Sequence, residues 1–196
     1  MKRKMQNKIF VLLLCAFLLV LSLAATARPA LALGPWKAQI VDAESKQPVN
    51  NVVVLAVWTK VTLVPEGSVN LLYYDSVEVI ADPEGRFTIA ERDYSRFDAH
   101  VLAEPELFFF KPGYGQWRFQ GEEIWLKLDA DEKRKRYAEA GKLFGSTGVV
   151  IEMPPLKTRE ERARYYRDRI QPYGVPLEQK RAWLETDRVE REHLGL

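Results

Sequence analysis

The pattern of apolar and polar residues divides the chain into three stretches. An almost uninterrupted apolar run covers residues 9–25 and follows a basic start. Residues 36–128 carry short apolar runs separated by turn residues, the pattern of several short β-strands. Residues 129–196 hold more charge and carry helix start and stop signals. We therefore divide the chain into an N-terminal segment at 1–32, a β domain at 33–128 and a helical C-terminal extension at 129–196.

The N-terminal segment has the three parts of a secretory signal peptide. Lysine and arginine residues precede the apolar run, and Ala25–Ala27 and Ala30–Ala32 both fit the small-x-small cleavage pattern. We expect an exported, periplasmic or extracellular protein, cleaved after Ala27 or after Ala32. The alternative is retention as a membrane anchor, although the run is at the short end of the roughly 20 apolar residues that a spanning helix needs. The single cysteine, Cys15, lies in this run, so the mature chain would have no disulfide and no thiol nucleophile.

The β domain shows strong turn signals between its apolar runs. Asp82–Gly85 has the residues that a type I turn favours, which predicts an antiparallel hairpin between the runs on either side. Lys111–Tyr114 has Pro then Gly at its centre, as a type II turn does. The alternation in Arg86–Ala90 indicates one buried face. The predicted strands are residues 36–42, 52–64 (one bent strand or two), 77–81, 86–90, 99–103, 107–110, 116–119 and 124–128.

The C-terminal extension is predicted to contain three helices. The first covers Asp131–Gly141, the second begins at a capping box of Thr158 and Glu161 and runs to about residue 170, and the third begins near Pro176 and ends near residue 194. Their apolar faces are thin, so we expect them to pack on something. Residues 33–128 carry nine basic and fourteen acidic side chains, and residues 129–196 carry fifteen and thirteen. A mildly basic extension could thus fold back on an acidic β domain.

Three motifs, in order, resemble the carboxypeptidase regulatory-like domain. Residues 38–54 look like its opening, Asp82–Phe87 resembles its Asp-x-x-Gly-x-Phe turn, and Phe110–Tyr114 resembles its Lys-x-Gly-Tyr motif. The resemblance covers residues 36–128 and implies a mainly β, transthyretin-like (prealbumin-like), seven-stranded β-sandwich. It also implies an accessory module that binds a partner or a glycan and has no catalytic machinery. The long segment 57–76 departs from the family pattern, so the middle of the sandwich could be rearranged.

The side chains that catalysis or metal binding would need are sparse. His100 with Glu104 and Glu106 is a weak zinc pattern, because a catalytic site usually has three protein ligands in compatible geometry. The acidic residues at 129–132 are better explained as the start of a helix than as a calcium loop. Arginines at 159–169 alternate with acidic residues, which indicates an ion-paired helix face and not a nucleic-acid site. We expect no enzyme activity, no metal and no cofactor.

Aromatic residues supply the candidate binding surface. Consecutive side chains of a strand point to opposite faces, so Phe108–Phe110 cannot all face one core. Either the C-terminal extension or a partner must cover the second face. Exposed aromatic patches mark binding sites, and the candidates are Trp58, Phe109, Tyr114 and Trp117.

These observations predict an exported, non-catalytic binding or structural module of the cell envelope that contacts another envelope protein. The alternative is a carbohydrate-binding module that uses surface aromatic residues, followed by a small envelope hydrolase. The membrane would be a partner only if the signal segment is retained as an anchor. The sequence names neither the partner nor the oligomeric state.

Overall fold

The computed structural model describes residues 34–63, 68–92, 94, 100 and 104–196. All of these belong to one of the two units into which the chain divides, residues 33–196. The predicted signal segment lies outside the described residues. So does the predicted strand at 99–103, apart from His100.

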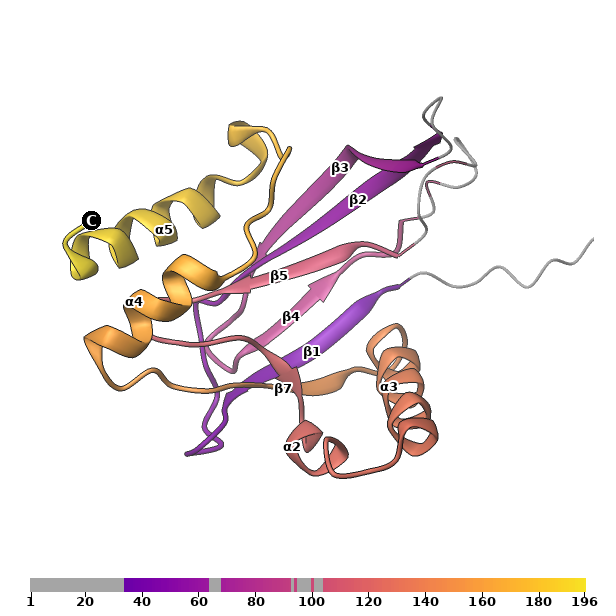
Figure 1. Cartoon of the computed structure of the whole chain (residues 1–196), viewed down its shortest axis with the longest axis horizontal. Coiled ribbons are helices and arrows are strands. Elements are labelled where there is room, and N and C mark those ends of the chain that lie inside the picture. The colour runs from indigo at the N-terminus through magenta and orange to yellow at the C-terminus, as the bar shows by residue number, and fades with distance from the viewer. Residues whose placement is uncertain (1–33, 64–67, 93, 95–99, 101–103) are drawn as a thin grey trace, which may run out of the picture. The chain divides into compact units, whose positions relative to one another are not determined.

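Two β-sheets form the centre of the described chain (Figure 1). Sheet A has the strand order β4-β1-β7-β6, and sheet B has the order β3-β2-β5. All neighbours are antiparallel except β1 and β7, which are parallel. The strands are β1 (Trp36–Asp42), β2 (Val53–Leu63), β3 (Val69–Ile80), β4 (Arg86–Ile89), β5 (Glu106–Phe110), β6 (Arg118–Phe119) and β7 (Val149–Met153).

The core lies between the inner faces of the two sheets. Ile40 of β1 and Ile151 of β7 meet Val54 and Trp58 of β2, and all four are buried. Alternate residues of the same strands point away from this core, as the two-residue period of a strand requires. The prediction of a mainly β fold is confirmed to this extent: two packed sheets, with helices around them.

The predicted hairpin around Asp82–Gly85 is wrong in its pairing, although the turn itself is present. Gly85 N donates to Asp82 O at 2.9 Å, and Gly85 has a φ of +72°. However, β3 pairs with β2 in sheet B, whereas β4 pairs with β1 in sheet A. The turn therefore carries the chain from one sheet to the other. Its chemistry fixes a reversal of direction but does not decide which neighbour each strand takes.

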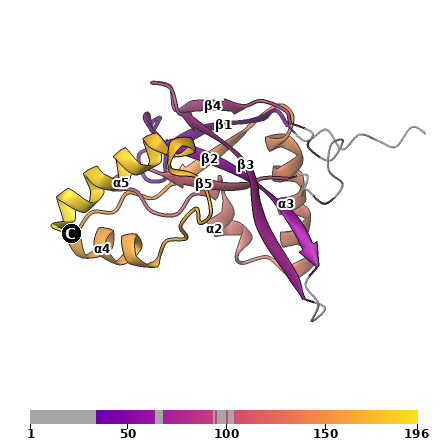
Figure 2. The ribbon, with the colours of Figure 1, turned by 90° about the horizontal axis from the view of Figure 1, so that it is seen from above.

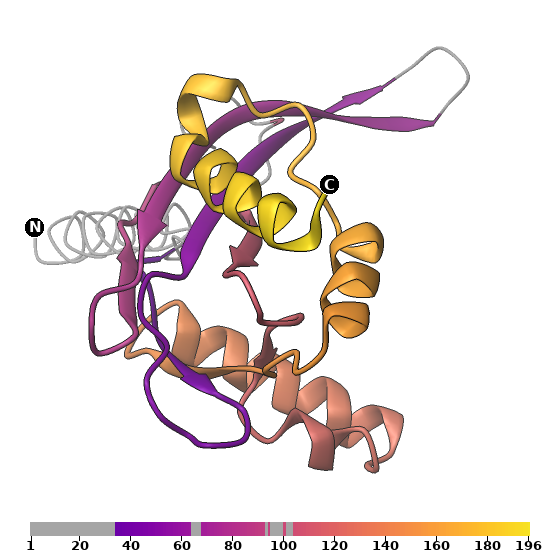
Figure 3. The same cartoon turned by 90° about the vertical axis from the view of Figure 1, so that its left-hand side faces the viewer.

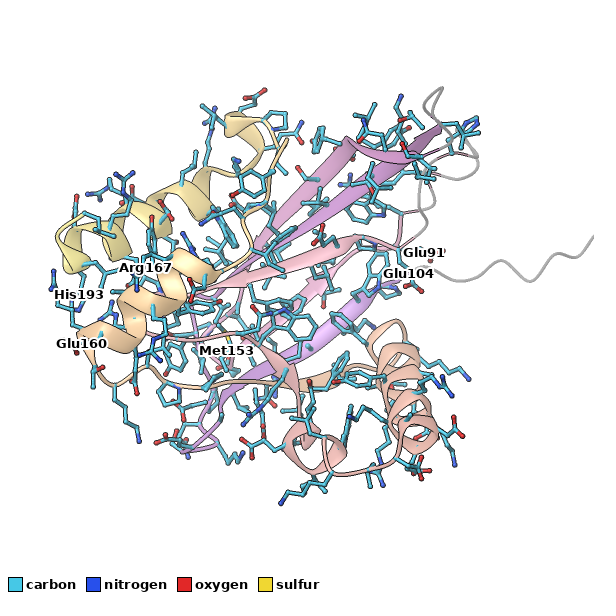
Figure 4. The ribbon with its side chains drawn as sticks, in the orientation of Figure 1. Glu91, Glu104, Met153, Glu160, Arg167 and His193 are labelled. Atoms are coloured by element: carbon cyan, nitrogen blue, oxygen red, sulfur yellow. The ribbon has the colours of Figure 1, made fainter. Side chains whose placement is uncertain are left out.

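Two further differences concern residues 122–153. The predicted strand at 124–128 is wrong, because Glu122–Trp125 forms the short helix α2 after Gly121, with two glutamates in its first turn. The strand β7 was not predicted, and the C-terminal extension supplies it to the interior of sheet A, between β1 and β6. Residues on both sides of position 128 thus share one sheet, and Met153 at the end of β7 is fully buried (Figure 4).

The longer helices agree with the predicted ones within a few residues. They are α3 (Ala130–Phe144), α4 (Arg159–Asp168) and α5 (Arg181–Leu194), the last preceded by the short 3-10 helix η2 (Leu177–Gln179). The capping box of Thr158 and Glu161 is present at the start of α4. Asp129 accepts hydrogen bonds from the first backbone N–H groups of α3, so the acidic residues here begin a helix, as predicted.

The C-terminal extension packs on the outer face of sheet B. Trp183 of α5 lies against Phe108 and Phe110 of β5, with ring centroids 6.2 and 5.3 Å away. Phe109 points the other way, into the core between the sheets. Views along two other directions show α5 and α3 on different sides of the sheets (Figures 2 and 3). The extension therefore covers the second face of β5, the face on which Phe108 and Phe110 lie.

Candidate binding surfaces

The four predicted surface aromatics do not form an exposed patch. Trp58 is 0% exposed and Phe109 is 4% exposed, and both belong to the core between the sheets. Tyr114 and Trp117 are partly buried and pack against the same core. This candidate surface is wrong because large rings bury the most apolar area, and here the fold uses them to fill its interior.

Trp117 nevertheless borders a small cavity beside the free side of β5. The ring of Trp117 lies 4.7 Å from that of Phe109, and Tyr165 and Arg169 come from the end of α4 and just beyond it. The cavity is about 50 Å³, and it is lined by Glu106, Leu107, Phe108, Phe109, Gln116, Trp117, Tyr165, Arg169, Ile170 and Trp183.

A buried guanidinium is the main polar group of this cavity. Arg169 is 7% exposed, forms an ion pair with Asp187, and holds its guanidinium carbon 4.0 Å from the ring centre of Phe110. Its Nη1 is buried and has no hydrogen-bond partner. Burial raises the pKa of the neighbouring Tyr165, which favours the neutral phenol.

The size of the cavity limits what it can hold. A volume of about 50 Å³ suits roughly three or four waters, at 10–15 Å³ for each. Ligand pockets for small molecules usually have about 300–1,000 Å³. A sugar ring does not fit in a cavity of this size.

The most exposed apolar surface of the sheets lies on the long β2–β3 hairpin (Figure 3). Leu63 pairs with Val69, and Val61 pairs with Leu71, so these four side chains share one face. Leu63 is 81% exposed, Val69 is 59% exposed and Leu71 is 55% exposed. We call these four residues the apolar arm.

The other face of the same hairpin is mixed. Lys60, Thr62 and Asn70 lie there together with Leu72, and the Thr62 hydroxyl donates to Asn70 O at 3.2 Å. Tyr73 lies on the same face of β3 as Leu71 and packs with the cluster around Trp183. The apolar arm therefore lies on the face of sheet B on which the C-terminal extension packs. The arm thus continues a packed apolar face beyond the end of its cover.

The hairpin also leaves backbone groups open along its edges. Residues 53–57 of β2 pair with both β3 and β5, but from residue 58 onward β2 pairs within the sheets only with β3. Val61 N donates to His100 O at 2.8 Å. Among the described strands, β3 has β2 as its single neighbour. Such edges can accept a strand from another chain.

The metal and membrane alternatives gain no support from the described residues. In that part of the chain, no three His, Cys, Asp or Glu side chains are grouped as a metal site would need. None of the described helices has the length and apolar character needed to cross a bilayer. His193 is exposed on α5, with its Nε2 2.7 Å from Nη1 of Arg162 (Figure 4).

Comparison of the chain with known protein families, with curated proteins and with solved structures finds no match.

Proposed function

We propose that this protein is an exported, non-catalytic binding module of the cell envelope, and that the apolar arm is its contact with another envelope protein. The exposed face of Leu63, Val69 and Leu71 is the observation that carries the proposal. Contiguous exposed apolar surface costs free energy in water, and burial recovers about 25 cal/mol for each Å². A surface of this kind, on a projecting hairpin, marks an interaction site.

A protein partner fits the arm better than a lipid layer does. The β3 edge of the hairpin, at the edge of sheet B, carries backbone N–H and C=O groups for which hydrocarbon offers no hydrogen-bond partner. A partner protein can cover the apolar face and pair a strand of its own with one edge. Lys60 and Asn70 on the opposite face would then stay in water.

The family resemblance belongs to the same proposal. The three motifs fall at β1, at the turn between β3 and β4, and directly after β5. A transthyretin-like sandwich used as an accessory module agrees with the two packed sheets. The insertion of β7 beside β1 would be this chain's own addition to that plan.

The carbohydrate alternative loses the residues on which it depended. Trp58 and Phe109 are buried, and the cavity beside Trp117 is too small for a sugar ring. No arrangement in the described residues favours the hydrolase alternative.

Neighbouring residues of one strand provide a matched test. A photo-crosslinking amino acid is placed at Leu71, on the apolar arm, and separately at Leu72, on the opposite face and 42% exposed. After irradiation of intact cells, position 71 should give one protein adduct of defined mass, and position 72 should give little or none. The adduct at position 71 should disappear when Leu63→Asp is added, because a charge in the contact prevents burial.

Unchanged thermal unfolding of the variants would show that the fold is intact. Equal adducts from both positions, or none from position 71, would refute the proposal. Binding of the protein to vesicles of phosphatidylglycerol and phosphatidylethanolamine that Leu63→Asp abolishes would show that the arm contacts lipid instead.

A further inference from the structure

The outer face of sheet A carries a groove that is independent of the apolar arm. It has a volume of about 410 Å³, within the range of small-molecule sites. Its floor is formed by β4, β1 and β7, and the loop before β7 forms its end. The groove is lined by Lys37, Ala38, Gln39, Arg86, Phe87, Thr88, Thr147, Gly148, Val149 and Val150.

Strand register determines which of these side chains point outward. Lys37 pairs with Thr88, and Gln39 pairs with Arg86, while the residues between them belong to the core. Val150 of β7 lies beside Gln39 on the same face. The side chains that project into the groove are therefore two cations, an amide and hydroxyl groups, with one valine.

The two cations lie close together. Lys37 and Arg86 occupy diagonal positions on neighbouring antiparallel strands, where Cβ atoms are about 7–8 Å apart. Side chains of this length can converge on one ligand group. Like charges at this spacing repel each other, and a bound anion would remove that repulsion.

Neither cation is neutralised within the described residues. Lys37 and Arg86 form no ion pair there, and no acidic side chain lines the groove. The nearest acid along β7 on this face, Glu152, already binds Lys46 at 2.7 Å and Arg118 at 3.4 Å. The cationic character is local, because residues 33–128 carry fourteen acidic and nine basic side chains.

We propose that this groove binds an oxyanion group, phosphate, sulfate or carboxylate, carried by an anionic polysaccharide. Lys37 and Arg86 supply the charge for the oxyanion. Thr88 and Thr147 supply hydroxyl groups for neighbouring sugar hydroxyls, and Gln39, whose Nε2 donates to Glu84 O at 3.0 Å, supplies its Oε1 as an acceptor. The volume exceeds what one free ion fills. Single-stranded nucleic acid fits less well, since its bases need aromatic platforms and the one aromatic residue of the lining, Phe87, is buried in the core.

The test uses calorimetric titration of the purified protein with four probes: dextran sulfate, neutral dextran of the same length, inorganic phosphate and oligothymidylate. Dextran sulfate should bind, with an affinity that falls as salt is raised. Phosphate should compete weakly, and neutral dextran should not bind. The double variant Lys37→Gln with Arg86→Gln should bind dextran sulfate about tenfold more weakly, since two charge-assisted contacts are lost.

A matched variant separates the groove from general charge. Lys127→Gln with Lys135→Gln removes the same number of charges from exposed positions outside the groove and should leave binding unchanged. An equal loss of affinity in both double variants would overturn the proposal. So would binding of oligothymidylate as tight as that of dextran sulfate, or phosphate binding as tight as the polymer.

The single variant Arg86→Gln, on the edge strand β4, should weaken binding in the same direction if the double variant fails to fold. A folded Arg86→Gln protein with unchanged affinity would also overturn the proposal. None of these variants changes a residue of the apolar arm. A negative result for the groove would therefore not bear on the proposed protein contact, which the crosslinking experiment tests separately.

Discussion

A Trp183→Ala substitution should lower the free energy of unfolding by about 3–5 kcal/mol, because the indole of Trp183 holds the C-terminal extension on sheet B. Trp183 is 3% exposed and packs on Phe108 and Phe110 of β5. It also lies 5.7 Å from the guanidinium of Arg169, so its removal weakens the surroundings of a buried cation.

The magnitude follows from the buried area. An aromatic side chain buries about 200 Å², which corresponds to about 5 kcal/mol at 25 cal/mol for each Å². A denatured chain that keeps some of this area buried lowers the figure to about 3–4.5 kcal/mol. The helix should remain anchored at its start, because Glu78 of β3 accepts hydrogen bonds from the backbone N–H groups of Ala182 and Trp183 at 2.8 and 2.7 Å.

Urea unfolding followed by circular dichroism measures the loss. The next residue, Leu184, is 38% exposed, and Leu184→Ala should cost less than about 1 kcal/mol. The Trp183→Ala protein should still unfold in one transition, because the extension also supplies β7 to the interior of sheet A. A loss below about 1 kcal/mol, or a separate early transition of the helices, would show that the extension is not part of the same cooperative unit.

Four further predictions concern other parts of the fold. Gly85→Ala should destabilise the protein by more than about 2 kcal/mol in thermal unfolding, since Gly85 has a φ of +72° and an added Cβ would overlap Ile40 O. Thr158→Ala should cost about 1 kcal/mol by removing the side-chain cap of α4, measured by urea unfolding. Backbone N–H groups of Thr158 and Lys157 lower the pKa of Glu161 below its usual value. Its contribution is therefore present at neutral pH and is lost as the pH falls through the lowered pKa, so Glu161→Gln should lower the unfolding temperature at about pH 7 by an amount that shrinks as the pH is lowered. Glu152→Ala should cost about 1 kcal/mol in urea unfolding, because Lys46 loses its partner but is 55% exposed, whereas Arg118 still pairs with Glu123, and Glu152→Gln should cost less.

Local patterns predicted the elements whose signals are local. β1 was predicted at its observed bounds, and the start of α4 was predicted from Thr158 and Glu161, because a strand's alternation and a helix cap are both set within a few residues. The predicted run 52–64 forms the single strand β2, and the register of its pairing shifts between Trp58 and Thr59, where Tyr74 of β3 is the extra residue.

Pairing between distant segments was not predictable in this way. β7 is a five-residue run between a glycine loop and two prolines, and its partner β1 lies more than a hundred residues earlier. Nothing within β7 identifies that partner, since a parallel neighbour needs no turn signal beside it. The false strand at 124–128 arose because Ile124, Leu126 and Leu128 alternate as a strand would. Gly121 and the acidic first turn of α2 were the stronger signal.

The candidate surface shows why residue type misled more than position did. Aromatic rings were chosen as contacts because they are large, yet the same property makes them the best filling for the core between two sheets. Trp58 lies where β2 still faces β1 across the core, and it is fully buried. Three residues further on, beyond the bulge, Val61 begins the apolar arm, and by Leu63 the side chain is 81% exposed. Aliphatic side chains are left exposed where the strand extends beyond the part of the sheets that would bury them. The length of the hairpin, and not its aromatic content, is therefore the sequence feature on which the proposed partner contact rests, because the described residues Val61, Leu63, Val69 and Leu71 place apolar side chains on one face.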